Sequence, residues 1–200
     1  MAAEIIMNDK EMLRTLIKER IAALTPEQIA SADEAIMDKL LSQSAWQQAQ
    51  TVFCYLAVGR EIATLPLLRA ALAAGKRIAA PLITSPGIME ARLISDLADL
   101  HPDRYGIPAP PPDSALLLPM EIDLVIVPGV AFARQTLLRL GRGGGYYDRY
   151  LSPCPALRIA LAREAQLLDD ILPAEAHDLA MDMLVSEKRI YLPPSPNFKP

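Results

Sequence analysis

The 200-residue chain has few cysteines, few aromatic residues and no basic excess. Its two cysteines, Cys54 and Cys154, lie far apart without a Cys-x-x-Cys pair, which fits free thiols in a reducing compartment. The net charge of -4 argues against a general nucleic-acid binder, because such proteins present a basic surface. No apolar run approaches the roughly 18 residues of a membrane span, and no secretory signal is evident. We therefore expect a cytoplasmic protein that binds neither nucleic acid nor membranes.

Apolar residues make up 52% of the chain and charged residues 22%, close to the averages for globular proteins, so the chain should fold. The length predicts one domain over residues 1–192, and the proline-rich residues 193–200 read as a tail. Prolines also cluster at residues 108–112, where they indicate a rigid loop. We expect this single domain to be a monomer.

Periodicity predicts two helices before the first strand. Apolar residues recur at helical spacing over residues 9–23, and Thr25, Pro26 and Gln28 predict a capped second helix to about residue 42. Later segments predict strands at 51–58, 77–83, 88–94, 123–129 and 157–162, with a helix at 64–76. This alternation predicts a three-layer, Rossmann-like α/β fold with a largely parallel sheet, helices on both faces and two N-terminal helices.

The stretch "RLGRGGGYYDRYL", residues 139–151, places four glycines in five positions ahead of a short helical pattern. Consecutive glycines reach positive φ values and let backbone N–H groups converge on an anion. A following helix N-terminus favours phosphate, and Arg139 and Arg142 add charged donors. The loop lacks the Lys-Ser/Thr of a P-loop and the Gly-x-Gly-x-x-Gly spacing of a dinucleotide site, so these residues alone predict only an anion site or a glycine-rich connection.

The same stretch resembles the signature of the 5-formyltetrahydrofolate cyclo-ligase family, also called methenyltetrahydrofolate synthetases. Other motifs of that family match in order and spacing between about residues 10 and 186. They are "KEMLR" (10–14), "YLAVGREIAT" (55–64), "YGIPAP" (105–110), "DLVIVPGVAF" (123–132) and "AHDLAMD" (176–182).

The resemblance implies an enzyme that uses ATP and Mg²⁺ to cyclise 5-formyltetrahydrofolate to 5,10-methenyltetrahydrofolate, with release of ADP and phosphate and a phosphorylated formyl intermediate. Its partners are then these small molecules. The resemblance assigns catalysis to Arg142 and Tyr146, and metal binding to Asp148 and Asp178. It assigns ATP contacts to Lys10, Arg14, Arg139, Leu140, Gly141, Arg142, Gly143, Gly144, Gly145, Tyr146 and Tyr147. It assigns folate contacts to Leu56, Glu61, Arg142, Gly143, Gly144, Gly145 and Tyr146.

Several alternatives stay open at this point. Family members usually carry Phe-Asp-x-x-Gly before Arg-Leu-Gly, whereas "FARQTLLRLG" has Ala133, no glycine and one residue more, which motivates a non-catalytic folate- or nucleotide-binding paralogue. A phosphotransferase acting on another small molecule is a third hypothesis. His177, Asp178 and Asp182 could form a zinc or iron centre, and Asp182 could join the Mg²⁺ site. Without the resemblance, Lys10 and Arg14 read as a solvated helix face.

Overall fold

A computed structural model describes residues 2–103, 106–169, 172–173, 175 and 178–193, with side chains from residue 9 onward. The chain divides into two compact units. The first unit comprises residues 1–40, 128–144 and 159–200, and the second comprises residues 41–127 and 145–158. Most of the residues expected to contact ATP fall in the first unit, and the folate contacts Leu56 and Glu61 fall in the second.

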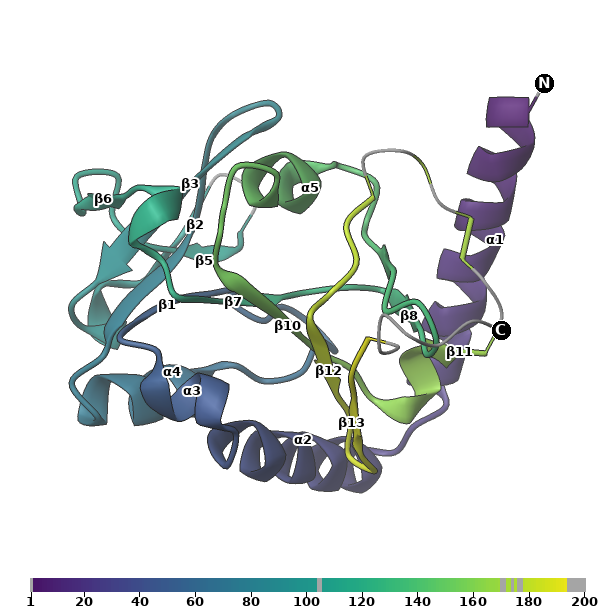
Figure 1. The fold of residues 1–200 in the computed structure, drawn as a ribbon, viewed down its shortest axis with the longest axis horizontal. Helices are drawn as coiled ribbons and strands as arrows, with labels where there is room; N and C mark the ends of the chain where they lie inside the picture. The colour runs from purple at the N-terminus through teal and green to yellow at the C-terminus, as the bar shows by residue number, and fades with distance from the viewer. Residues whose placement is uncertain (1, 104–105, 170–171, 174, 176–177, 194–200) are drawn as a thin grey trace. The chain divides into compact units, whose positions relative to one another are not determined.

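The first unit contains two long helices and two small groups of strands (Figure 1). Strand β10 pairs in parallel with β12, which pairs in the antiparallel sense with β13. A second sheet has the order β11-β8-β9. The elements are α1 (Ala2–Ala22), α2 (Pro26–Leu41), β8 (Ala131–Ala133), β9 (Arg139–Leu140), most of β10 (Leu157–Leu161), the 3-10 helix η3 (Glu164–Gln166), β11 (Leu167–Leu168), β12 (Met183–Val185) and β13 (Ile190–Tyr191).

The second unit is built on a mixed sheet in the order β7-β1-β2-β3-β6. Strand β1 is parallel to β2 and β7, while β3 is antiparallel to both β2 and β6. The elements are α3 (Ser44–Gln48), β1 (Thr51–Cys54), α4 (Leu65–Ala73), β2 (Arg77–Ser85), β3 (Ile88–Ile94), η1 (Leu97–Asp99), β4 (His101–Pro102), β5 (Pro108–Ala109), β6 (Leu116–Leu117), η2 (Pro119–Glu121), β7 (Leu124–Val127) and α5 (Tyr146–Leu151).

The predicted α/β class with a largely parallel central sheet and two leading helices is confirmed. The capping box is also present, since Gln28 N donates to Thr25 Oγ1 at 3.2 Å and Thr25 N donates to Gln28 Oε1 at 2.9 Å. The strand predicted over residues 51–58 is shorter, because the chain turns after Cys54 and Thr64 Oγ1 donates to Tyr55 O at 2.8 Å. The strand predicted at residues 88–94 is present as β3, which returns along β2 as a hairpin.

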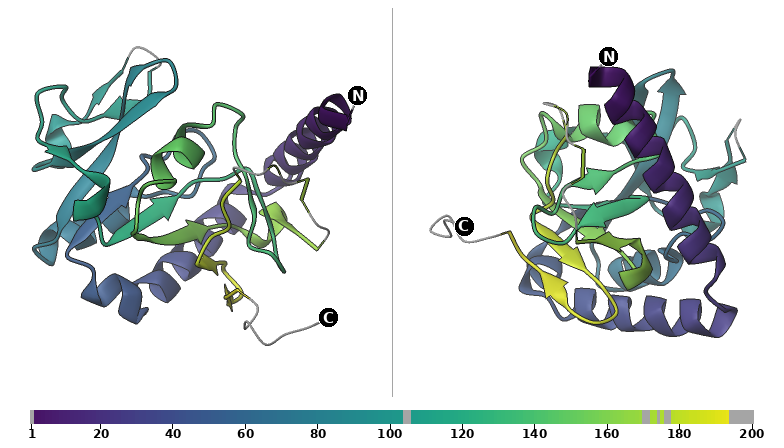
Figure 2. Two further views of the ribbon diagram at one scale, coloured as in Figure 1. Left: turned by 45° about the horizontal axis from the view of Figure 1, so that its top comes forward. Right: turned by 90° about the vertical axis from the view of Figure 1, so that its right-hand side faces the viewer.

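Helix α1 packs on the β8–β9 hairpin, and Figure 2 shows the helix beside these strands. Leu13, Ile17 and Ile21 recur at helical spacing and meet a cluster of apolar residues that includes Ala131 and Leu140. Burial of this apolar stripe supplies most of the stability of such a helix. The same packing brings Arg14, at the edge of the apolar stripe, close to the segment that follows β9.

None of the helices among the described residues is long and apolar enough to cross a membrane.

Candidate functional site

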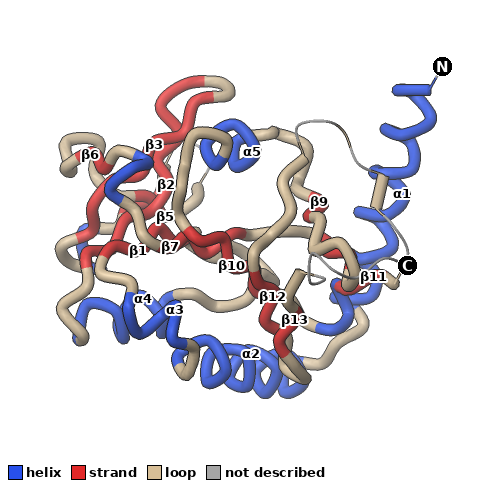
Figure 3. Tube along the Cα trace, viewed as in Figure 1, coloured by secondary structure: helices blue, strands red, loops and turns tan. Residues whose placement is uncertain are grey.

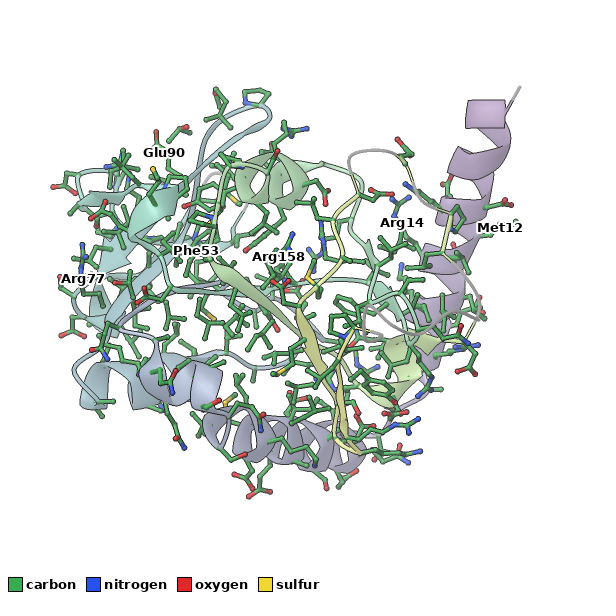
Figure 4. All side chains as sticks on the ribbon, in the orientation of Figure 1. Met12, Arg14, Phe53, Arg77, Glu90 and Arg158 are labelled. Carbon is green, nitrogen blue, oxygen red and sulfur yellow. The ribbon has the colours of Figure 1, made fainter. Side chains whose placement is uncertain are left out.

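Helix α1 directs Lys10 and Arg14, one turn apart, to different partners in the first unit. Lys10 Nζ donates to Glu175 Oε1 at 2.8 Å and to Asp178 Oδ2 at 2.9 Å, and Lys10 is only 9% exposed. Arg14 Nε donates to the backbone oxygen of Gly141 at 2.9 Å. Figure 4 shows Arg14 on one side of α1 and Met12 on the other. Both basic residues are therefore held by contacts, so the solvated-face interpretation is wrong for them.

The carboxylates around Lys10 keep its charge in a buried position. Burial acts to lower the pKa of Lys10, but hydrogen bonds to Glu175 and Asp178 outweigh it and raise that pKa above its ordinary value. Asp178 Oδ2 also accepts a hydrogen bond from Glu175 N at 2.9 Å. Two residues assigned separately by the resemblance, Lys10 for ATP and Asp178 for a metal, thus form a direct ion pair.

The glycine loop, defined as residues 139–145, begins with a buried arginine. Arg139 is 9% exposed, and its Nη1 donates to the oxygen of Pro128 at 3.1 Å. A Cβ at Gly141 would lie 2.8 Å from Arg139 Nη1, so the arginine side chain occupies the space that a larger residue would need. The Arg139 side chain therefore packs beside Gly141 and supports the base of the loop.

The tip of the loop is exposed and has a backbone suited to close approach by a ligand. Arg142, Gly143 and Gly144 are exposed, and Gly143 has a φ of 98°, which disfavours any side chain. A Cβ at Gly143 would lie 3.5 Å from Arg14 Nη2, so the Arg14 guanidinium reaches this part of the loop too. Arg14 and Arg142 thus bring two positive charges to an exposed, glycine-lined stretch of backbone.

The loop leads into α5 of the second unit. The Arg149 side chain lies against the first residues of this helix. Gly145 caps the helix with a φ of 64°, and a Cβ there would lie 2.7 Å from Arg149 Nη1. The Arg149 guanidinium lies 5.5 Å from the ring centre of Tyr146, and Arg149 Nε donates to the oxygen of Gly87 at 3.0 Å. Arg149 therefore tethers Tyr146 to the turn between β2 and β3, a role that the sequence analysis missed.

The remaining tyrosines of α5 anchor the helix on β1. The rings of Tyr147 and Phe53 stack with centres 6.1 Å apart, and the Tyr150 ring lies 4.9 Å from the same phenylalanine. Burial raises the pKa of the Tyr150 hydroxyl well above its usual value. Asp148 lies half-buried in the first turn of α5. Tyr147 thus packs against the sheet of the second unit.

Leu56 and Glu61 lie at the carboxyl end of β1, where parallel sheets tend to bind ligands. Leu56 is buried, and Glu61 Oε2 accepts a hydrogen bond from Val58 N at 2.9 Å. Glu61 N in turn donates to Val58 O at 3.2 Å. The carboxylate is therefore fixed by its own turn rather than by the N-terminus of α4, which begins only at Leu65.

The zinc or iron hypothesis finds no support among the described residues. His177 lies outside them, and no group of three or more His, Cys, Asp or Glu side chains in the described segments could hold a metal ion. Asp178 is paired with Lys10, and Asp182 is half-buried farther along the chain.

The altered segment before the glycine loop forms the turn of the β8–β9 hairpin. Figure 3 shows that the strands in this part of the chain are short and are joined by loops. The sequence shows that this segment is altered, but it does not reveal the partners of Arg134. Its guanidinium contacts Glu164 and Tyr191, which lie 30 and 57 residues away in the chain.

Comparison with known proteins gives one consistent family. A model of the 5-formyltetrahydrofolate cyclo-ligase family matches residues 6–187. The 5-formyltetrahydrofolate cyclo-ligase of Escherichia coli (strain K12) is 30% identical over 182 residues, covering 88% of this chain and 99% of that protein. That of Mycolicibacterium smegmatis is 31% identical over 201 residues, covering 90% and 94%. The NMR structure of Aquifex aeolicus 5,10-methenyltetrahydrofolate synthetase superposes with a TM-score of 0.82 at 26% identity, covering 96% of both chains.

Proposed function

The chain belongs to the 5-formyltetrahydrofolate cyclo-ligase family, and on that premise we propose that it converts 5-formyltetrahydrofolate to 5,10-methenyltetrahydrofolate with ATP and Mg²⁺, releasing ADP and phosphate. The observation that carries the proposal is the exposed glycine loop with Arg14 bonded to its base. Backbone N–H groups and arginines in such a loop are the groups that bind phosphate.

The ATP side of the proposal rests on the first unit. Arg14 and Arg142 would bind phosphate oxygens, and Lys10 would contribute charge while shared with its two carboxylates. Arg139, Leu140 and Gly141 form the base of the loop, and Gly143 and Gly144 leave its backbone accessible. Gly145, Tyr146 and Tyr147 continue the assigned ATP segment into α5.

The folate side of the proposal rests on the carboxyl end of β1. Glu61 is held by its bond from Val58 N, so its carboxylate is already oriented before substrate arrives. A fixed carboxylate accepts hydrogen bonds from the N–H groups of a reduced pterin without a further ordering cost. Leu56, a buried residue five positions earlier in the chain, would supply apolar contact. Arg142, Gly143, Gly144, Gly145 and Tyr146 are the loop residues proposed to adjoin the same substrate.

The reaction itself requires that a poor leaving group be made a good one. The formyl oxygen attacks the γ-phosphorus of ATP, an O–P bond forms, and the bond to the ADP oxygen breaks. The N10 lone pair then attacks the formyl carbon, the new C–N bond closes the ring, phosphate leaves with its oxygen, and the N10 proton is lost. The proposed catalytic residues are Arg142 and Tyr146, because charge on the transferring phosphoryl group must be neutralised. The Tyr146 ring is held in place by the Arg149 guanidinium.

Asp178 and Asp148 are carboxylates, the ligand type that Mg²⁺ prefers. Asp178 pairs with Lys10, and Asp148 lies at the start of α5. Magnesium is usually held by one or two carboxylates together with nucleotide phosphates, so a cluster of three protein ligands is not needed. Either aspartate would hold the ion against the phosphates, and the ion would supply positive charge there.

The alternative of a non-catalytic paralogue was motivated by the altered segment before the loop. In the structure that segment closes a hairpin, with Ala131 paired to Leu140 and Phe132 to Arg139. The loop therefore still starts from a strand, and we favour the enzyme.

A single coupled assay tests the proposal. Purified protein with 5-formyltetrahydrofolate and MgATP should give methenyl absorbance and ADP in equal amounts. ADP without methenyl product, in a screen of other small molecules, would instead indicate a phosphotransferase. Binding of ATP or folate with neither product, across a range of pH and metal concentration, would indicate the non-catalytic paralogue.

A further inference from the structure

The turn of the β8–β9 hairpin has a strained backbone. Leu137 has a φ of 54°, a value that bulky residues rarely adopt, and its side chain is fully buried. Its N–H donates to Ala133 O at 2.9 Å, and Ala133 N donates to Leu138 O at 3.0 Å. Strain of this kind persists only where the surrounding structure holds it in place.

The Arg134 side chain provides such a hold. Its Nη1 donates to Glu164 Oε2 at 2.7 Å and to the Tyr191 hydroxyl at 2.6 Å. Its Nε lies 2.8 Å from Asp169 Oδ1, and the guanidinium carbon lies 5.8 Å from the centre of the Tyr191 ring. A planar guanidinium with several donors suits this set of partners, whereas a lysine would satisfy only part of it.

Glu164 links this contact to the β12–β13 hairpin. Its Oε1 accepts hydrogen bonds from Ser186 Oγ at 2.5 Å and from the Tyr191 hydroxyl at 3.0 Å. Burial opposes its ionisation, but the bonds from Ser186, Arg134 and Tyr191 outweigh that effect and lower the pKa of Glu164. Arg134 is therefore bound to a half-buried carboxylate that Ser186 and Tyr191 of the β12–β13 hairpin also hold.

The hairpin transmits its position directly to the glycine loop. Val130 N donates to Leu140 O at 2.8 Å, and Gly141 follows in the chain. The other side of β8 is fixed by Gln166 Nε2, which donates to Gly129 O at 3.0 Å. With β8 held by Gln166, a shift of the turn at residues 134–138 would be taken up by β9 and by the loop after it.

We propose that Arg134 is a positioning residue for the glycine loop, acting through the β8–β9 turn and anchored by Glu164 and Tyr191. This inference goes beyond the proposed function but rests on it for the identity of the ligand, ATP. Arg134 compensates for a turn without the usual aspartate and glycine, because its interactions hold the strained Leu137 conformation that a glycine would adopt freely.

The test compares Arg134→Gln with Arg92→Gln. Arg92 of β3 is a matched control, since its side chain is 19% exposed against 23% for Arg134, and it pairs with Glu90 at 2.6 Å. We expect Arg134→Gln to raise the KM for ATP about tenfold or more, because small misplacements of a binding group are costly, and to raise the KM for the folate by a smaller factor, since Glu61 and Leu56 lie outside the loop. Arg92→Gln should leave the KM for ATP unchanged.

Amide hydrogen exchange of the peptide at residues 138–145, measured without ligand, gives a second readout. Exchange there should be faster in Arg134→Gln than in the wild type and unchanged in Arg92→Gln. If Arg134→Gln does not fold, Tyr191→Phe, which removes one partner of the arginine, should show the same effects at smaller size.

A lower thermal midpoint with an unchanged KM for ATP and unchanged exchange would show a merely structural role and overturn the inference. Inactivity of the wild type would refute the proposed function instead, and faster loop exchange in Arg134→Gln would still support the positioning role.

Discussion

Removal of the Arg14 side chain gives the sharpest test of the ATP side of the site. Arg14→Ala removes a 2.9 Å hydrogen bond from a charged donor to Gly141 O and a guanidinium that reaches Gly143. A hydrogen bond to a charged group contributes about 1.5–3 kcal/mol. If that energy is expressed in nucleotide binding, the KM for ATP should rise about 10- to 100-fold.

Lys18 offers a matched control for this variant. It carries the same charge on the same helix, one turn farther along, and its side chain is exposed. Surface substitutions of this kind change stability by less than about 0.5 kcal/mol. Lys18→Ala should therefore keep the wild-type KM for ATP and show only a small, salt-dependent change in the rate of ATP association.

The measurement is steady-state kinetics of methenyl formation, with ATP and 5-formyltetrahydrofolate varied separately and the thermal midpoint recorded for each variant. A contact role predicts a large effect for Arg14→Ala and none for Lys18→Ala. Equal effects in both variants would mean that long-range electrostatic attraction accounts for ATP binding, and not the position of Arg14 at its hydrogen bond to Gly141. A wild-type KM in Arg14→Ala would refute the assignment outright.

Four further variants test other parts of the site. Arg142→Ala, in the exposed loop tip, should lower kcat about 10²- to 10³-fold with a thermal midpoint near that of the wild type, measured by turnover and calorimetry. Asp148→Asn should raise the Mg²⁺ concentration that gives half-maximal activity, as a metal titration would reveal. Leu137→Gly should destabilise by no more than Leu137→Ala in denaturant unfolding, since glycine relieves the φ of 54° that alanine keeps; a clearly larger loss would argue against strain there. The raised pKa of Lys10 contributes stability that is complete below the ordinary value of about 10.4 and is lost as pH rises through the raised value, so the advantage of the wild type over Lys10→Gln should shrink at strongly alkaline pH.

Local patterns predicted the elements well where short-range physics decides them. The capping box at Thr25 and the apolar period of α1 are properties of neighbouring residues, and both appear as expected. The strand at residues 88–94 was also visible, but its antiparallel pairing was not, because the turn at residues 86–87 decides it. Pairing direction depends on a partner segment and not on the strand itself.

The partners of the site residues could not be read from the sequence. Lys10 meets Glu175 and Asp178 from 165 and 168 residues away, and nothing in the pattern around Lys10 indicates carboxylates. The segment that contains Arg134 departs from the family motif, but the contacts of Arg134 with Glu164 and Tyr191 in distant segments cannot be seen in it. Long-range contacts of this kind follow only from the assembled fold.

The charge balance in the first unit gives a physical reason why the proposed reaction would need magnesium. Lys10, Arg14, Arg139 and Arg142 are positive, but Glu175 and Asp178 already neutralise part of that charge through Lys10. Arg139 lies buried at the base of the loop, whereas the Arg14 guanidinium reaches Gly143 and Arg142 is itself exposed at the tip. A triphosphate carries more negative charge than two arginines can offset, and Mg²⁺ bound to its phosphates would reduce the excess. In the proposed function Asp178, oriented by Lys10, would hold that ion, and the Lys10–Asp178 pair would then have a function beyond stabilising α1.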